Sequence, residues 1–60
     1  MRKPLYKAHL RPGVRGAAME WLASNDRLGS CLNIYDNGSA GLLFVFHDRA
    51  TALMMKLAIG

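Results

Sequence analysis

The chain has a single cysteine, few aromatic residues and no long apolar run. Its 60 residues include one Cys, one Trp, two Tyr and two Phe. A lone Cys31 cannot form an intramolecular disulfide, which excludes the disulfide-stapled class of small secreted domains and fits a reducing cytosol. The longest apolar stretch, AGLLFVF, is shorter than the roughly 20 residues that span a bilayer. We therefore expect a soluble, cytoplasmic protein that does not enter a membrane.

The length leaves room for one domain with a small core. We assign residues 1–60 to a single domain, because no internal repeat, linker or low-complexity segment interrupts them. A chain of about 60 residues buries only about 60% of the surface that it exposes when unfolded, so its own core is marginal. Since no disulfide can add stability, we expect self-association, most simply as a homodimer.

Acidic residues are also scarce, and the basic ones are unevenly placed. The net charge is +4, and residues 1–15 contain five Lys or Arg but no Asp or Glu. Within this segment we predict a basic patch of Lys7, Arg11 and Arg15. Such a cluster can attract phosphates, anionic lipid or an acidic protein surface, and the alternative is a solubilising terminus. An acidic protein and a nucleic acid are therefore the candidate partners.

The first half of the chain predicts a strand followed by a helix. In PLYKAHLR, residues 4–11, apolar positions alternate, which indicates a half-buried strand with Tyr6, Ala8 and Leu10 on its inner side. After the breaker RPG, residues 13–24 have apolar side chains at helical spacing. The stripe consists of Val14, Ala17, Ala18, Trp21 and Leu22. The helix is expected to end at Ser24, since Ser, Asn and Asp follow there.

Asn37 and Gly38 lie between two runs rich in strand-forming residues and predict a hairpin with a two-residue type I′ turn. In that register Cys31 faces Phe44. One face of the hairpin then carries the apolar and aromatic set Tyr35, Leu42, Phe44 and Phe46, and the other carries Leu32, Ile34, Leu43 and Val45.

Asp48 is predicted to be the N-cap of a last helix, since its carboxylate can accept a backbone N–H and suits the helix dipole. The expected buried stripe is Ala50, Leu53, Met54 and Leu57. Met55 and Ile59 lie off that stripe, so either the helix contacts a second surface or residues 56–59 form a fourth strand. The order is βαββα, or βαββαβ with that strand. This is a small α+β fold of ferredoxin-like type, with an antiparallel sheet and two helices on one face.

No convergent set of catalytic groups is visible in the sequence. His47 and Asp48 are adjacent, so on a strand their side chains point to opposite faces and favour a structural joint between strand and helix. His9 is the only other histidine, and it approaches His47 only if the first strand pairs with the second hairpin strand. Cys31 has no basic neighbour in its segment that would lower its pKa. We expect no enzyme, no catalytic residue, no metal site and no cofactor.

The hairpin is apolar on both faces, whereas two short helices can cover only one. We therefore expect Tyr35, Leu42, Phe44 and Phe46 to form an open, partner-binding face. The favoured hypothesis is a small non-catalytic interaction protein, homodimeric, which binds a host or partner macromolecule. The alternative is a single-stranded nucleic-acid-binding module, in which bases stack on these aromatics and the basic patch holds phosphates.

Two resemblances accompany this interpretation. The run GLLFVFHDRATALMMKLAIG resembles the third strand and second helix of the RNA recognition motif through Gly41, Phe44 and Val45, and LYKAHL is similar to that family's first-strand motif. This resemblance implies RNA binding on a sheet. The same run is similar to the ends of short uncharacterised proteins of tailed bacteriophages. That second resemblance implies a compact, phage-encoded, host-directed accessory protein without catalysis.

Overall fold

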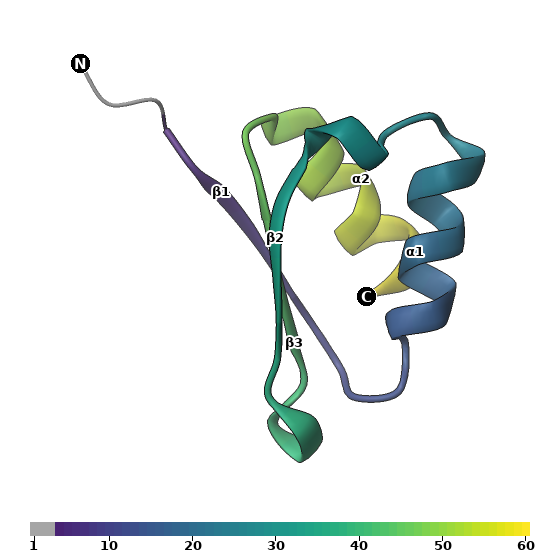
Figure 1. Ribbon diagram of the computed structural model, residues 1–60, viewed down its shortest axis with the longest axis vertical. Helices are drawn as coiled ribbons and strands as arrows, with labels where there is room; N and C mark the ends of the chain where they lie inside the picture. Colours follow the sequence, from purple (N-terminus) through teal and green to yellow (C-terminus); the bar gives the residue numbers. More distant parts are fainter. Residues whose placement is uncertain (1–3) are drawn as a thin grey trace.

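Strands and helices follow one another in the order β-α-β-β-α (Figure 1). The computed structural model describes residues 4–60, so Arg2 and Lys3 of the basic N-terminal segment lie outside it. The elements are strand β1 (Tyr6–Leu10), helix α1 (Arg15–Ser24), the 3-10 turn η1 (Leu28–Ser30), strand β2 (Cys31–Asp36), the 3-10 turn η2 (Gly38–Ala40), strand β3 (Leu42–Phe46) and helix α2 (Arg49–Ile59).

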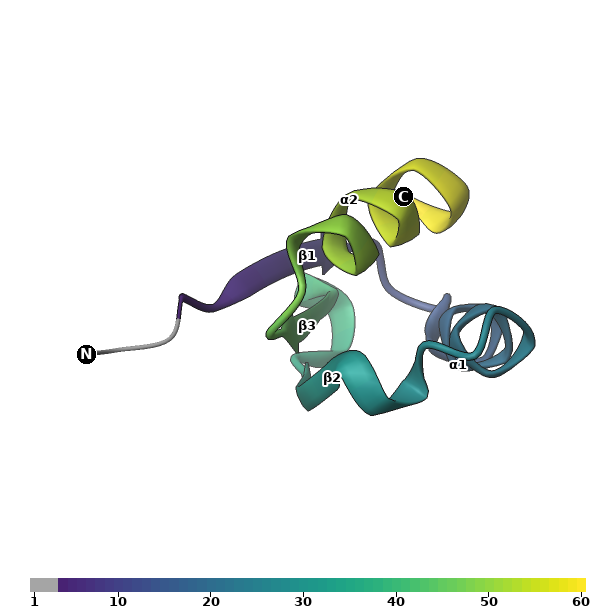
Figure 2. The same ribbon diagram turned by 90° about the horizontal axis from the view of Figure 1, so that it is seen from above.

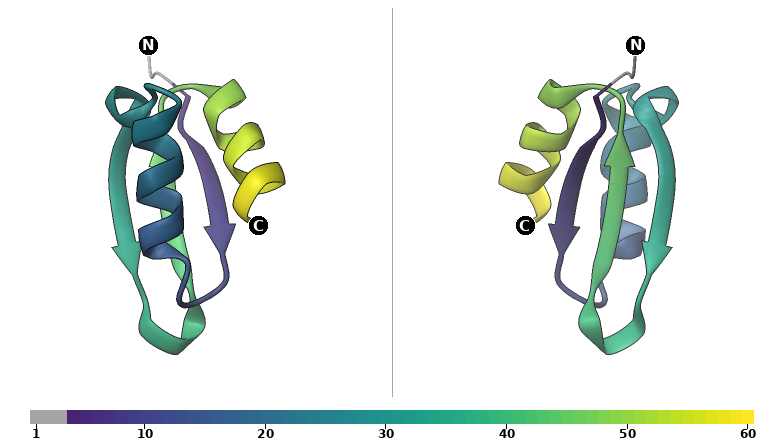
Figure 3. Two further views of the ribbon diagram at one scale, coloured as in Figure 1. Left: turned by 90° about the vertical axis from the view of Figure 1, so that its right-hand side faces the viewer. Right: turned by 90° about the vertical axis from the view of Figure 1, so that its left-hand side faces the viewer.

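The three strands form one antiparallel sheet in the order β1-β3-β2, with the last strand in the centre. Both helices lie on the same side of this sheet (Figure 2). The opposite side, which the right-hand view of Figure 3 presents, carries no helix within residues 4–60. The predicted small α+β fold with an antiparallel sheet is confirmed at this level.

The core fills the space between the sheet and the helices. Phe44 and Phe46 project from the central strand, are fully enclosed, and stack with ring centroids 6.2 Å apart. Each buried Phe stabilises the fold by about 1.5–3 kcal/mol relative to exposure. The apolar residues that surround them come from every major element except β2: Ala8, Leu10, Val14, Ala18, Leu22, Leu42, Ala52 and Met55.

The predictions for β1 and α1 are largely confirmed. Ala8 and Leu10 are buried and Tyr6 packs against the core, as strand alternation requires. The helix begins two residues later than expected, at Arg15, and ends at Ser24. Just beyond it, the Asn25 side-chain amide donates a hydrogen bond to the Trp21 carbonyl, 2.8 Å away, and so satisfies a carbonyl of the last turn.

The hairpin turn is wider than predicted. A type I′ turn needs positive φ at both central residues, but Asn37 has φ −100° and only Gly38 is positive, at φ 62°. The Asp36 carboxylate instead accepts the Gly38 N–H at 2.9 Å, and the Asn37 N–H donates to the Gly41 carbonyl at 2.9 Å. The loop between the strands therefore contains five residues, 37–41, and not two.

This longer loop changes the register of the strands. Ile34 lies opposite Phe44 and Tyr35 opposite Leu43, where the sequence had placed Cys31 opposite Phe44. The shift is an odd number of residues, and an odd shift exchanges the two faces of one strand relative to the other. Phe44 now shares its face with Ile34 and points toward the helices.

Helix α2 is also rotated relative to the prediction. Thr51, Ala52 and Met55 are its buried residues, and Ile59 packs against the core. Leu53 and Leu57, expected inside, are exposed. Residues 56–59 are helical, so the alternative of a fourth strand is wrong for the part of the chain that the structure describes.

Candidate functional site

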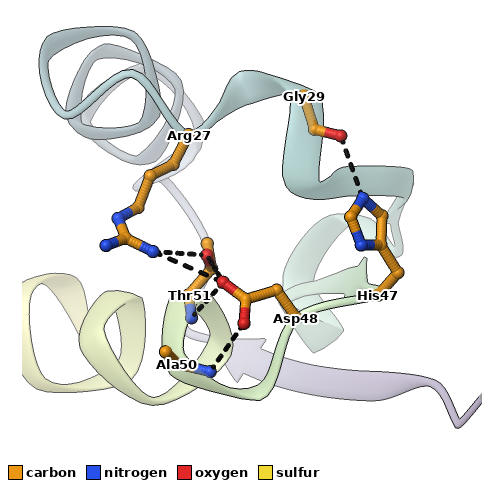
Figure 4. Close-up of polar contacts among 6 residues, drawn as sticks. All are labelled: Arg27, Gly29, His47, Asp48, Ala50 and Thr51. Carbon is orange, nitrogen blue, oxygen red and sulfur yellow. Dashed lines mark hydrogen bonds and ion pairs between the residues drawn. The ribbon is translucent and has the colours of Figure 1, made fainter.

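The adjacent His47 and Asp48 form a joint between β3 and α2. The Asp48 carboxylate accepts the backbone N–H groups of Ala50 and Thr51, both at 3.3 Å, and so caps the helix (Figure 4). Nε2 of His47 lies 3.2 Å from the Gly29 carbonyl oxygen, to which it donates in the matching tautomer. The two side chains thus hold different neighbours, and the predicted helix cap is confirmed.

A buried hydroxyl extends this joint to the segment after α1. Thr51 is fully buried, and its Oγ1 donates to Asp48 Oδ2 at 2.5 Å while it accepts from Arg27 Nη1 at 2.9 Å. The Arg27 guanidinium also lies 3.4 Å from Asp48 Oδ2. The Thr51 hydroxyl, the backbone N–H groups and Arg27 together lower the pKa of Asp48, the hydroxyl most. The Asp48 carboxylate therefore has a structural role, in which it caps α2 and contacts Arg27.

The remaining candidate catalytic groups are not brought together. β1 does pair with β3, but His9 lies opposite Leu43, whereas His47 follows Phe46 at the other end of that strand. Partial burial raises the pKa of the Cys31 thiol, which disfavours the reactive thiolate. In residues 4–60 no three His, Cys, Asp or Glu side chains are placed to hold a metal ion.

The predicted partner-binding face is wrong for three of its four members. Leu42, Phe44 and Phe46 belong to the core between sheet and helices, and only Tyr35 is exposed, at 49% of its surface. The wider loop and its register account for the exchange. In the folded protein, nucleic-acid bases cannot stack on the rings of Phe44 and Phe46, because both rings are enclosed. An open aromatic face therefore gives no support to the expected homodimer, which then depends only on the small size of the core.

The true open face of the sheet is largely polar. Val45 occupies its centre but is only 6% exposed, because Lys7 and Asn33 lie directly opposite it on the neighbouring strands. His9 and Tyr35 flank the half-buried Leu43 in the same way. Among residues 4–60, the two apolar side chains at the centre of the open face, Leu43 and Val45, are therefore largely covered by polar neighbours.

Both edges of the sheet are blocked to further strand pairing. On β2, a bulge interrupts the register between Cys31 and Asn33, and the Asn33 side chain accepts the Ile34 N–H at 2.9 Å. On β1, Lys56 Nζ donates to the His9 carbonyl at 2.5 Å. Bulges and edge charges are common devices against edge-to-edge association. Beside β2 lies an open groove of about 360 Å³, lined by Met19, Leu28, Cys31, Leu32, Asn33 and Ile34.

The structure divides the predicted basic patch. Arg15 pairs with the Asp36 carboxylate at 3.9 Å, near the hairpin loop. Arg11 instead donates a hydrogen bond to the Ile59 carbonyl at 2.6 Å, in the last turn of α2. A cation at the C-terminal end of a helix interacts favourably with the helix dipole. Lys7 projects from the open face of β1, opposite Val45. Arg11 thereby joins Lys56 at the end of α2.

A surface that the sequence had not predicted lies on the outer side of α2. We define the outer stripe of α2 as Arg49, Leu53, Lys56 and Leu57, which have helical spacing i, i+4, i+7 and i+8. Leu53 is 53% exposed and Leu57 87%, the largest fraction among the exposed large apolar residues. The signal in the sequence was the presence of apolar residues on two sides of one helix. The pattern could not say which side is buried.

The basic residues of this region lack acidic neighbours. β1 and α2 contain Lys7, Arg49 and Lys56 but no Asp or Glu. Asp48, which precedes α2, is held by Arg27 and by the helix that it caps. Of the remaining acids, Asp36 lies on β2 and pairs with Arg15. Glu20 lies on α1 and Asp26 follows that helix, so within the described residues β1 and α2 themselves carry basic charges and no acidic ones.

Comparison with protein-family models, with curated proteins and with solved structures finds no match. The resemblances to the RNA recognition motif and to short phage proteins stay predictions. Within residues 4–60, neither helix has the length and apolar content needed to cross a membrane.

Proposed function

We propose that the protein is a non-catalytic interaction module that binds an acidic surface of a partner protein through the basic side formed by β1 and α2. The observation that carries the proposal is the position of Arg49. This residue is the first of α2, where a cation opposes the helix dipole, and it makes no ion pair among the described residues. Neither the helix dipole nor an ion pair therefore accounts for an arginine there, whereas a negatively charged partner does.

Arg11 and Lys56 support the same proposal from the other end of α2. Their side chains donate to the Ile59 and His9 carbonyls, which restricts their positions without neutralising their charge. A positive surface with fixed groups accelerates encounter with an acidic partner and fixes its orientation. The predicted ferredoxin-like type belongs to this proposal as well, and the sheet order β1-β3-β2 with both helices on one side supports it.

Nucleic acid is the weaker alternative, because Phe44 and Phe46, the rings intended for base stacking, are enclosed. Tyr35 is the remaining aromatic on the open face, and single-stranded binders combine several such platforms with their basic groove. The phage origin and host-directed role predicted from the last twenty residues would supply a biological setting for an acidic protein partner.

The test is titration of a poly-glutamate peptide, monitored by isothermal calorimetry at low and moderate salt. Arg49→Glu should weaken binding roughly threefold or more, as expected for loss of an ion pair and gain of a repulsion. Arg15→Glu is the matched control, since it changes the net charge equally but lies beside Asp36. An equal effect of the two variants would show that only net charge matters, and the assigned site would be wrong.

Arg49→Glu should leave the fold intact. The new carboxylate lies at the N-terminus of α2, where a negative charge is favourable by about 0.3–1 kcal/mol at low ionic strength. Thermal unfolding by circular dichroism should therefore show an equal or higher Tm. A fall in Tm would attribute the binding defect to misfolding and remove Arg49 from the proposed site.

A further inference from the structure

The outer stripe of α2 combines two properties that the proposed function alone does not explain. Arg49 and Lys56 give it positive charge, yet Leu53 and Leu57 place two large apolar side chains beside them in water. A face that only attracts anions gains nothing from exposed leucines, because each keeps apolar surface in water. The inner side of the helix is already satisfied by the core, so these leucines are not needed there.

From this combination we infer that the outer stripe of α2 is the docking site for an acidic amphipathic helix of a partner protein. The inference rests on the proposed function and specifies its ligand. Leu53 and Leu57 are four residues apart and form one i, i+4 ridge, which fits between side chains of a second helix. Arg49 and Lys56 lie along one side of this ridge, where they meet carboxylates along one edge of the partner's apolar stripe.

A second copy of the chain is a poorer occupant of this site. Two outer stripes placed face to face would bring Arg49 and Lys56 of one copy against the same cations of the other. An anionic membrane is also disfavoured, because α2 contains no aromatic residue to anchor it at a bilayer surface.

The groove beside β2 does not compete for this role. Its rim includes the exposed Leu28 and Leu32, but the β2 edge next to it is interrupted by the bulge, and Asn33 occupies the Ile34 N–H. An extended peptide therefore lacks a regular row of backbone partners there. None of its six lining residues carries a charge that would select a ligand.

The experiment uses two synthetic helical peptides that share their glutamates and differ only in one stripe, leucine in the first and serine in the second. Binding to the whole protein is measured by calorimetry, and the contacted residues are mapped by amide chemical shifts. We expect the leucine peptide to bind roughly tenfold more tightly or better, with the shift changes centred on α2. Leu57→Ser should remove most of this difference.

Leu32→Ser is the matched control, because Leu32 and Leu53 are each 53% exposed and lie on different sides of the molecule. Leu53→Ser should weaken binding of the leucine peptide, whereas Leu32→Ser should not. Equal affinity for the two peptides would overturn the helix-docking inference while leaving the proposed acidic partner in place. If the wild-type protein binds neither peptide, the proposed function is overturned as well.

Three further outcomes would contradict the inference. The first is a shift map centred on Tyr35 and the open sheet face. The second is Leu57-dependent binding to vesicles of phosphatidylcholine and phosphatidylserine together with no binding of the leucine peptide at millimolar concentration. The third is preferential binding of a single-stranded oligonucleotide over the leucine peptide at the same salt concentration.

Discussion

Truncation of Phe44 tests the register of the sheet, on which the assignment of every surface depends. The ring is fully enclosed and stacked on Phe46. Phe→Ala in a core costs about 3–5 kcal/mol, and a 60-residue domain has about 3–9 kcal/mol of total stability at 0.05–0.15 kcal/mol per residue. Phe44→Ala should therefore remove from about a third to all of the protein's stability, and Phe44→Leu should be folded but less stable.

Tyr35→Ala is the matched comparison, because the hairpin predicted from the sequence placed both rings on one open face. In the structure Tyr35 is about half exposed, and its hydroxyl accepts from the Asn33 amide at 3.0 Å. Its removal should cost less than about 1 kcal/mol, as for most surface substitutions. Urea unfolding followed by circular dichroism gives the free energies. Similar losses for Phe44→Leu and Tyr35→Ala, both small, would refute the observed register and restore the open aromatic face.

Three other outcomes follow from individual contacts. Asp48→Ala should lower the Tm at pH 7, and the difference in Tm from the wild type should shrink on acidification. The reason is that folding lowers the pKa of Asp48, so its contribution to stability is complete above about pH 4. That contribution is lost as the pH falls through the pKa of the folded state. Gly41→Ala should destabilise by at least about 1–3 kcal/mol in urea unfolding, because φ is 102° and the added Cβ would meet the Leu10 carbonyl, whereas Gly29→Ala, which meets open space, should have little effect. The Cys31 thiol, whose pKa is raised by burial, should react with a disulfide reagent at pH 8 more slowly in the folded protein than in urea, and equal rates would contradict its position.

Those features that depend on neighbouring residues could be predicted from the sequence. The alternation in residues 4–11 placed Ala8 and Leu10 correctly inside. Helical spacing correctly predicted Ala18 and Leu22 as buried, although Ala17 of the same stripe is exposed, and the polar residues after Ser24 predicted the end of α1. Asp48 was identified as a cap because its carboxylate bonds to N–H groups only two and three residues away. Such interactions are set within a few residues, so the local sequence specifies them.

The candidate site could not be predicted in the same way. Asn37-Gly38 is compatible with a two-residue turn. The burial of Phe44 and Phe46, however, stabilises the hairpin more than that turn would, and the wider loop gives the register in which both rings are buried. Likewise α2 is apolar on two sides, and the exposed leucines could not be told from the buried ones by spacing alone.

The sequence by itself therefore determined the order of the first five strands and helices, the inner side of β1, the capped joint at Asp48 and the excess of basic residues. Only the tertiary structure decided the register of the hairpin, the rotation of α2 and the separation of Arg15 from Arg11. The physical reason is that both faces of β3 and two sides of α2 are apolar, so burial against distant elements, and not local preference, selects which side becomes core and which becomes surface.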